Sequence, residues 1–436
     1  MSKSFYTASL TRRTFLSATS VIAIAAVVPP ALAKQQTLKI GYVTPQTGAL
    51  AAFAEADEFV IKQVNEALAG SIKTANGPVN VEIIVRDSQS NPNRAGEVAR
   101  QLIVDDKVQL IVVAATPDTA NPVSAQCEIE GIPCISSVAP WQPWFISRQA
   151  NPADPSTWKS FQYNYHFFWG LEDVAATYQG MWGQLDTNKQ VGGLFPNDAD
   201  GNAWGAPKTG LPALLGPAGY TIHDPGRFQS LTDDFTAQIG AFKAAGADIV
   251  TGVVVPPDFT TFWTQANQQG YKPKIVSTAK AVLFPVAVEA LGAIGHNLST
   301  EVWWSPSHPF NSSLTGASAG ELASSFTAAT GRPWTQPIGF VHALFEVSVD
   351  AIKRAKDPFD PDALAAAIGK TNLHTIVGLV QFGAEGLPPV VAANVSKTPL
   401  VGGQWRHQKD GSFDLVIVEN GAHPEIPAAG TMEAIE

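Results

Sequence analysis

Residues 316–320 place a serine, Ser318, in the pattern G-x-S-x-G that marks the nucleophile of many hydrolases. Such a serine needs a strand directly before it and a helix directly after it. Here a loop rich in proline and serine, residues 305–315, precedes the motif. The segment therefore predicts the entry to a helix that begins near Ala319, and we do not expect an enzyme.

A second polar motif, Asp198-Ala199-Asp200-Gly201-Asn202, begins like a calcium-binding loop. That loop needs glycine at its sixth place and glutamate at its twelfth, where this chain has alanine and threonine. We expect instead a loop from a strand into a helix, in which Gly201 or Asn202 caps the helix and Trp204 faces a cleft. The eight histidines include no pair four residues apart, so we expect neither a metal nor a cofactor.

The chain has two cysteines, Cys127 and Cys134, which are too few for a structural zinc site. We expect Cys127 in the last turn of a helix and Cys134 in the following strand, with a turn at Gly131 between them. At that separation the two thiols either form one disulfide in an oxidising compartment or stay buried separately. The sequence leaves both possibilities open.

Residues 115–119 have the composition of a binding loop at the end of a strand. They follow an apolar run, residues 109–114, and Thr116 followed by Pro117 is typical of the start of a helix. Hydroxyl and amide groups at this end of a helix bind carboxylates, and the partial positive charge of the helix end favours this. The alternative is that Thr116 serves only as a helix cap.

These loops lie in an alternation of strand-like and helical segments. Strands are predicted at 38–44, 79–86, 109–114, 132–136, 190–195, 220–223, 248–255 and 274–277, and helices at 52–68, 93–105, 119–130, 172–185, 204–215, 232–245 and 259–269. Repeated β-α units imply parallel sheets with helices on both faces. An irregular stretch at 138–162 divides the alternation, which predicts two sheets. The last part is predicted to hold helices near 317–329, 338–356 and 361–369, and strands at 377–382, 400–405 and 413–419.

The first 33 residues predict export. Arg12 and Arg13 precede an uncharged stretch, and Ala31-Leu32-Ala33 follows it, which is the order of a secretory signal peptide. The paired arginines resemble the twin-arginine type, although Ser17 stands where that pattern often has lysine. We expect cleavage after Ala33 and a periplasmic protein. A membrane anchor is the alternative, but the apolar stretch is too short to span a bilayer.

Charge and length limit the function further. Removing the signal peptide takes away three of the 28 basic residues and none of the 38 acidic ones, which leaves 25 minus 38, a net charge of −13. A chain this acidic is not expected to bind nucleic acid or an anionic membrane surface. The remaining 403 of 436 residues exceed what one hydrophobic core usually serves, which predicts two lobes.

Four segments, in this order, resemble the solute-binding proteins of bacterial ABC transporters, and most closely the branched-chain amino acid binding type. They are Leu38-Lys39-Ile40-Gly41-Tyr42-Val43-Thr44-Pro45-Gln46-Thr47-Gly48, Arg86-Asp87-Ser88-Gln89-Ser90-Asn91-Pro92, Ile129-Glu130-Gly131-Ile132-Pro133 and the strand-helix unit 248–270. The resemblance covers nearly the whole chain after the signal peptide.

The resemblance implies an α/β fold of two Rossmann-like lobes with parallel-rich sheets, joined by three crossings, which is the type I periplasmic binding protein fold. Residues 34–167 and 300–372 would form the first lobe, and residues 168–299 and 373–436 the second. Such lobes close on a ligand held at the carboxyl ends of the strands.

The resemblance also implies where ligand-binding residues lie. The loop 115–119 matches one through which the family contacts a ligand carboxylate, and residues 137–141 match a second ligand loop. The expected ligand-binding residues are Phe53, Thr116, Asp118, Val138, Trp141, Trp204, Val255 and Lys280. The aromatic members favour a cleft with apolar walls and a few polar groups, although core packing explains each of them equally well.

Two departures from amino acid binding proteins bear on the ligand. Those proteins place an acidic residue after the strand 274–277, where it pairs with the ligand ammonium, and this chain has Ala279 and Lys280 there. A tyrosine of those proteins is likewise replaced near Val255. Burying an ammonium without a charged partner is costly, so we expect a carboxylate without an α-ammonium group. Lys280 would suit a second anionic or polar group, or would alternatively lie in solvent.

The residues and the resemblance together predict the periplasmic substrate-binding component of an ABC importer, which captures an aromatic or apolar carboxylate by hinge closure. Its partners would be the small ligand and the permease subunits in the inner membrane, and we expect a monomer. The alternatives are a branched-chain or aromatic amino acid as the ligand, an exported serine hydrolase built on Ser318, and a ligand sensor without transport.

Overall fold

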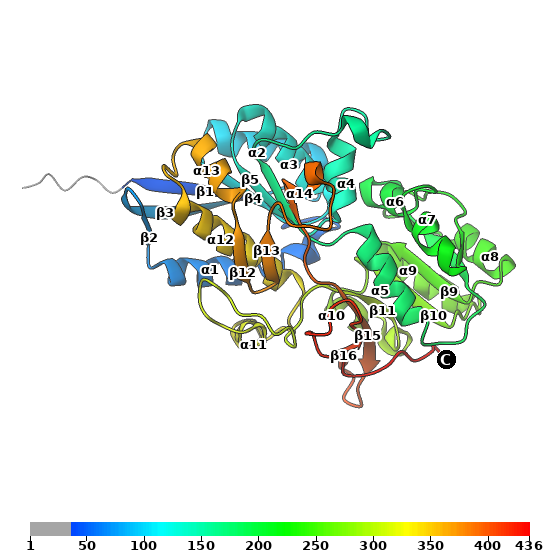
Figure 1. Ribbon diagram of the computed structural model, residues 1–436. Coiled ribbons are helices and arrows are strands. Elements are labelled where there is room, and N and C mark those ends of the chain that lie inside the picture. Colours follow the sequence, from blue (N-terminus) through cyan, green and yellow to red (C-terminus); the bar gives the residue numbers. More distant parts are fainter. Residues whose placement is uncertain (1–35) are drawn as a thin grey trace, which may run out of the picture. The chain divides into compact units, whose positions relative to one another are not determined.

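The computed structural model describes residues 36–436, which form two seven-stranded sheets and a two-stranded hairpin (Figure 1). The strands of the first sheet are β1 (Thr37–Thr44), β2 (Ser71–Thr74), β3 (Gly77–Asp87), β4 (Leu110–Val113), β5 (Cys134–Ser137), β6 (Asn164–Phe167) and β14 (Val395–Ser396). Those of the second are β7 (Gln190–Leu194), β8 (Thr221–His223), β9 (Ile249–Val253), β10 (Ile275–Ala279), β11 (Ser299–Val302), β15 (Val401–His407) and β16 (Phe413–Glu419). The hairpin is formed by β12 (Asn372–Thr375) and β13 (Gly378–Gln381).

Both sheets are parallel at their centres. The first has the order β14-β6-β5-β4-β1-β3-β2, with only β2 antiparallel to its neighbour, and the second has the order β16-β15-β11-β10-β9-β7-β8, with β15 and β16 antiparallel. The order β3-β1-β4-β5-β6 recurs as β8-β7-β9-β10-β11, so each sheet contains the same doubly wound unit. The predicted α/β fold of two Rossmann-like lobes is confirmed.

Helices cover both faces of each sheet, as parallel strands require. They are α1 (Asp57–Leu68), α2 (Pro92–Val104), α3 (Pro117–Glu130), α4 (Trp141–Phe145), α5 (Leu171–Trp182), α6 (Ala199–Trp204), α7 (Leu211–Leu215), α8 (Thr236–Ala244), α9 (Pro256–Gln268), α10 (Pro285–Glu289), α11 (Ala319–Thr330), α12 (Pro337–Arg354), α13 (Pro361–Ile368) and α14 (Pro389–Ala392). In β4, Ile111 and Val113 pack with α2 and α3, whereas Leu110 and Val112 pack with α1 and α12. The alternation explains why this strand consists only of apolar residues.

The longest helix, α12, is buried along most of its length and supports the first sheet. Its packing depends on Gly339, because a Cβ atom there would lie 2.4 Å from Cδ1 of Trp304. Trp304 follows β11, and its indole Nε1 donates to the backbone oxygen of Ile376, 3.2 Å away. The glycine therefore lets a segment that leaves the second sheet pack directly against a helix of the first.

The chain passes between the two sheets three times, after β6, after β11 and after β14. The predicted second lobe included residues 373–396. This does not fit the order of the strands, because β14 pairs with β6 in the first sheet. The short length of β14 explains why its apolar pattern was not recognised. The other predicted lobe boundaries remain a prediction.

Two predicted helices differ from the observed ones. The helix predicted at 52–68 is divided into a 3-10 turn, Ala51–Ala54, and α1. The helix predicted at 204–215 is wrong, because α6 ends at Trp204 and α7 begins only at Leu211. Glycine at both ends of the intervening segment and a proline within it explain the interruption. The cap of α6 is Asp198 rather than Gly201 or Asn202, since its Oδ1 accepts from the backbone N–H of Gly201 at 2.7 Å.

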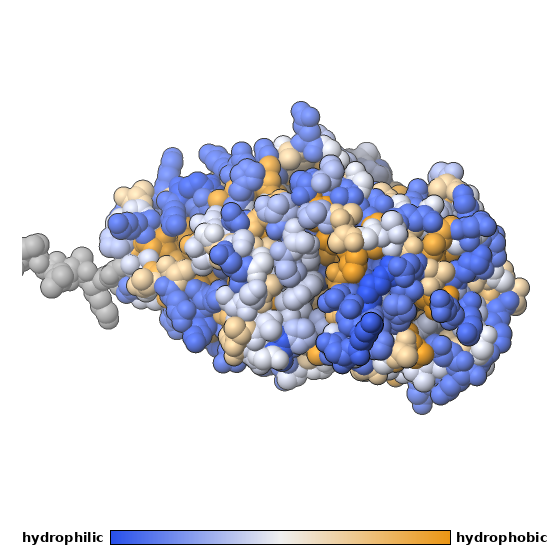
Figure 2. Space-filling view, turned by 90° about the horizontal axis from the view of Figure 1, so that it is seen from below, coloured by the Kyte–Doolittle hydropathy of each residue, from blue (hydrophilic) through white to orange (hydrophobic). Residues whose placement is uncertain are grey.

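The predicted signal peptide, residues 1–33, lies outside the described residues. Within residues 36–436, no helix combines the length and the hydrophobicity that crossing a bilayer would require. In the same part of the chain, Cys127 and Cys134 are both buried free thiols. A disulfide between them stays a prediction. The face of the molecule in Figure 2 shows hydrophilic residues with apolar patches between them.

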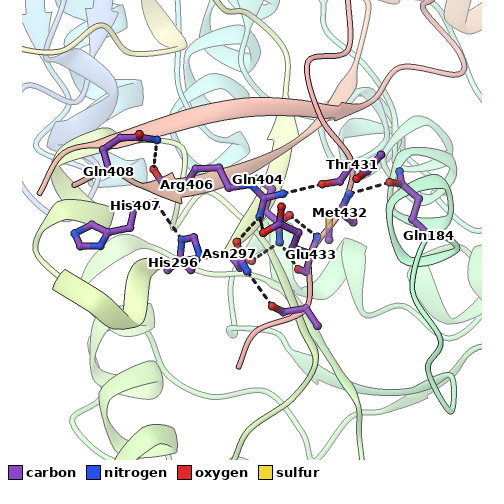
Figure 3. A network of polar contacts seen from close by, with 11 residues as sticks. Gln184, His296, Asn297, Gln404, Arg406, His407, Gln408, Thr431, Met432 and Glu433 are labelled. Atoms are coloured by element: carbon purple, nitrogen blue, oxygen red, sulfur yellow. Dashed lines mark hydrogen bonds and ion pairs between the residues drawn. The ribbon is translucent and has the colours of Figure 1, made fainter. Parts of the chain in front are cut away.

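The C-terminal segment packs back onto the second sheet through a polar network (Figure 3). Gln404 on β15 is fully buried, and its amide bonds both backbone groups of Glu433: Nε2 donates to the oxygen at 2.7 Å, and Oε1 accepts from the N–H at 2.9 Å. Its Nε2 also donates to the oxygen of Asn297 at 2.8 Å. Nearby, Met432 N–H donates to Oε1 of Gln184 at 2.8 Å. One buried amide thus satisfies three backbone groups of two separate segments.

We predict that Gln404→Leu lowers the free energy of unfolding by about 2–4 kcal/mol, because it leaves buried backbone groups without partners. Gln408→Leu is the matched control, since Gln408 makes a single side-chain bond, to the oxygen of Arg406, and should cost less than about 1 kcal/mol. Urea unfolding of both variants measures the difference. An equal decrease in the free energy of unfolding of the two variants would show that the network does not stabilise the C-terminal segment.

Candidate ligand-binding site

A small cavity of about 30 Å³ lies where strand ends of the two sheets meet. Its lining residues are Phe53, Thr116, Val138, Pro140, Phe168, Trp169, Asp200, Trp204, Val253, Ala279, Lys280, Leu283, Glu301 and Trp303. All of them lie at or beyond the carboxyl ends of parallel strands, four in the first sheet and four in the second. This is where open α/β sheets bind ligands, because the strand faces themselves are covered by helices.

Five of the eight predicted ligand-binding residues line this cavity: Phe53, Thr116, Val138, Trp204 and Lys280. Among the described residues, Asp118, Trp141 and Val255 do not belong to the lining. Val255 is the N-cap of α9, and the lining residue of that strand end is Val253, two positions earlier.

Trp141 instead contributes to a polar cluster where the chain passes between the sheets. Its Nε1 donates to Oε1 of Glu172 at 3.1 Å. Lys397, which follows β14, pairs with the same oxygen at 2.9 Å and with Oδ1 of Asp173 at 2.6 Å. Glu172 and Asp173 lie in the first turn of α5. The cluster therefore ties the first crossing to the third, and Trp141 has a structural partner.

Three hydrogen-bond donors in the cavity wall are buried and have no partner within the described chain. They are the hydroxyl of Thr116 and the indole N–H groups of Trp169 and Trp204. Buried polar atoms are nearly always hydrogen-bonded, because losing their contact with water is costly. Together these donors offer a set of positions that an acceptor group on a ligand would satisfy.

The local structure around Thr116 leaves its hydroxyl without a hydrogen-bond partner in the described chain. Thr116 occupies the N-cap position of α3, with Pro117 as the first helical residue, yet in the described structure its side chain makes no capping hydrogen bond. The interpretation that Thr116 is only a cap is therefore wrong for its hydroxyl. The residue before it, Ala115, has φ 92°, a backbone conformation that carries a cost in a residue other than glycine.

Two residues that line the cavity, Val138 and Lys280, are also in the left-handed region, both with φ 63°. For a β-branched valine this conformation is unusual. Each of the two directly follows a strand, β5 or β10. Strained backbone gathers at sites of function, and here it occurs at three strand ends around one cavity.

Lys280 is buried rather than solvated, and it is surrounded by carboxylates. Its Nζ lies 2.5 Å from Oδ2 of Asp200 and 3.9 Å from Oδ2 of Asp198. Burial alone would lower the pKa of Lys280, but Asp200, Asp198 and Asp118 outweigh this and raise it, so the side chain carries a positive charge. Burial raises the pKa of Asp200 to about 6, against the opposing effect of Lys280.

A second acid in the wall, Glu301, is held by its own neighbours. Its Oε2 accepts from the hydroxyls of Tyr178 at 3.1 Å and Thr300 at 2.9 Å. Burial raises its pKa to about 7 despite these bonds. The group is therefore poised near the boundary between its neutral and ionised forms at neutral pH.

Sequence reasoning missed the polar residues Trp169, Asp200 and Glu301. Trp169 follows β6, a short strand in a region predicted to be irregular. Asp200 lies four residues before Trp204 on α6 and shares its helix face, which the sequence could have indicated. Glu301 belongs to β11, and nothing in its local sequence marks it.

The serine motif has a structural role. Ser318 is the N-cap of α11 and makes a capping box with Glu321: its hydroxyl accepts from the N–H of Glu321 at 3.2 Å. The segment before it is a loop rather than a strand, so the geometry of a nucleophile elbow is not met. Over residues 36–436, no three His, Cys, Asp or Glu side chains are grouped so that they could hold a metal ion.

The comparisons with known proteins agree with this architecture. A family model described as periplasmic binding protein matches residues 37–396. The chain therefore belongs to the periplasmic binding protein family. A curated relative is the Leu/Ile/Val-binding protein homolog 8 of Brucella abortus (strain 2308), which is 23% identical over 407 residues, covering 88% of this chain and 91% of the relative.

Solved structures share the fold at low sequence identity. The leucine-binding protein LivK of Thermotoga maritima MSB8 superposes with a TM-score of 0.72 at 19% identity, covering 88% of this chain and 99% of that one. An ABC transporter solute-binding protein of Rhodopseudomonas palustris BisB5, solved with 3,4-dihydroxy benzoic acid, superposes with a TM-score of 0.68 at 18% identity. The match covers 88% of this chain and 96% of that one. LivJ of Streptococcus pneumoniae, solved with isoleucine, superposes with a TM-score of 0.65 at 17% identity, covering 88% of this chain and 100% of that one.

We predict that Thr116→Val leaves the free energy of unfolding unchanged or slightly raised, because its buried hydroxyl has no partner to lose within the described chain. The matched control is Thr44→Val. The hydroxyl of Thr44 is equally buried but donates to Oδ2 of Asp57 at 2.7 Å, so this change should cost about 1–3 kcal/mol. Urea unfolding without added ligand compares the two, and an equal loss would mean that Thr116 has a partner after all.

Proposed function

We propose that this protein is the periplasmic solute-binding component of an ABC importer. It captures a small aromatic or apolar carboxylate between its two lobes by hinge closure and delivers it, as a monomer, to permease subunits in the inner membrane. Membership of the periplasmic binding protein family and the cavity at the meeting strand ends support this role. We propose no catalytic step.

The observation that carries the choice of ligand is the set of unpartnered donors in the cavity wall, which also holds broad apolar rings. The hydroxyl of Thr116 and the indoles of Trp169 and Trp204 suit a carboxylate, which accepts several hydrogen bonds at once. The positive end of α3 adds to the attraction. Phe53, Phe168 and Trp303 supply broad rings for the apolar part of the ligand.

The charges in the wall favour a ligand without an α-ammonium group. The sequence favours this because no acid stands at position 279, and the structure supports it on a different ground. Two acids do line the cavity, Asp200 and Glu301. Asp200 is already neutralised by Lys280, and the raised pKa of Glu301 disfavours its charge. Neither supplies the uncompensated carboxylate that a buried ammonium requires.

The second candidate ligand is a branched-chain or aromatic amino acid. The two acids in the wall are the specific observation in its favour, because ionised Glu301 would attract an ammonium. The solved relatives include both ligand classes: isoleucine is bound in one, and hydroxylated benzoic acids in others. The ligand preference therefore has to be measured.

Calorimetry with 3-phenylpropionate and phenylalanine separates the two candidates, because the pair differs only in the α-ammonium. We expect the acid to bind at least tenfold more tightly. Thr116→Val should weaken the acid by about tenfold, as expected for a hydrogen bond to a charged group. Thr119→Val is the control, a buried threonine of α3 that does not line the described cavity. Tighter binding of phenylalanine would favour the amino acid candidate, and binding of neither would refute the proposed ligand class.

We also propose export by the twin-arginine route, with cleavage after Ala33. The paired arginines and the small residues before Lys34 support this. Changing Arg12 and Arg13 together to lysine should leave uncleaved precursor in the cytoplasm, whereas the parent protein should be recovered from the periplasm beginning at Lys34. N-terminal sequencing distinguishes these outcomes, and a periplasmic protein that begins at Met1 would contradict the proposal.

A further inference from the structure

We infer that Asp200 and Lys280 form a specificity-determining pair that recognises a neutral hydroxyl group on the ligand. The inference rests on the proposed function and extends it: the preferred solute is an aromatic carboxylate that carries a hydroxyl group away from its carboxylate. Asp200 would accept the hydroxyl hydrogen, and Lys280 would donate to the hydroxyl oxygen.

The first observation is an unsatisfied acceptor in the wall. Asp200 lies in the first turn of α6, is 1% exposed and lines the cavity. Its Oδ2 faces Nζ of Lys280 at 2.5 Å, while its Oδ1 is buried and has no hydrogen-bond partner in the described structure. A buried charged oxygen without a partner is costly, so a donor from the ligand would be favoured at this position.

The second observation is that two of the three unpartnered donors come from a different part of the fold than the acceptor, whereas the third, Trp204, shares α6 with Asp200. The unpartnered hydroxyl of Thr116 belongs to the first sheet, and the indole of Trp169 to the first crossing. Asp200 and Lys280 belong to loops of the second sheet, after β7 and β10. A ligand that satisfies all of these groups needs both an acceptor and a donor.

The charges around the pair select a neutral donor. An ammonium would lie beside Lys280, which is itself buried and charged, and would be repelled by it. A second carboxylate would face Asp200, with Asp198 and Asp118 also close to Lys280, and would be repelled by them. A hydroxyl both donates and accepts, so it satisfies Oδ1 of Asp200 and Nζ of Lys280 without adding charge.

The test compares benzoate with 3- and 4-hydroxybenzoate and with their methoxy analogues, which cannot donate. At least one hydroxybenzoate should bind about tenfold or more tightly than benzoate, as a hydrogen bond to a charged group predicts, and its methoxy analogue should lose that gain. In the double variant Asp200→Asn/Lys280→Met, which keeps the net charge, the difference between hydroxybenzoate and benzoate should disappear. The control variant is Asp258→Asn, which should retain the difference in affinity between hydroxybenzoate and benzoate. Asp258 is equally buried and lies in the first turn of α9, outside the described cavity lining.

Each failure has a distinct meaning. If benzoate binds but no hydroxybenzoate binds more tightly, the inference is overturned while the proposed function stands. If none of the carboxylates binds, the proposed ligand class fails and the inference fails with it. If the double variant does not fold, the ligand series on the parent protein still decides the case.

Discussion

Both sheets are parallel at their centres, and this constraint decides where a ligand can bind. Parallel strands need crossover helices, which cover both faces of each sheet and leave only the strand ends open. In this protein the carboxyl ends of eight strands border one cavity. The apolar sequence of β4 follows from this arrangement, because the strand is buried on both faces. The unusual backbone of Val138 occurs where the chain turns at the end of a strand.

Some polar groups at the cavity have partners in the protein, and others have none in the described chain. Glu301 is held by Tyr178 and Thr300. The charge of Lys280 is neutralised by Asp200, whose Oδ1 has no hydrogen-bond partner there. The donors of Thr116, Trp169 and Trp204 stay without partners within the described chain. Leaving a buried donor unpaired lowers stability, and we propose that a bound acceptor restores the missing bonds.

The sequence predicted the fold well because β-α alternation is a local pattern repeated many times. Short strands such as β14 were missed, since two residues carry no periodicity. The site was predicted where a loop follows a recognisable strand, as for Thr116. It was missed where partners are distant in sequence: Asp200 is 80 positions from Lys280, and their pairing depends on how β7 and β10 are ordered in the sheet.

The most direct test of the proposed site is a crystal structure of the protein with bound 3-phenylpropionate. We expect the ligand in the cavity, with its carboxylate within hydrogen-bond distance of Oγ1 of Thr116 and of at least one indole nitrogen of Trp169 and Trp204. A carboxylate paired with Lys280 instead, or a ligand bound outside this cavity, would contradict the account.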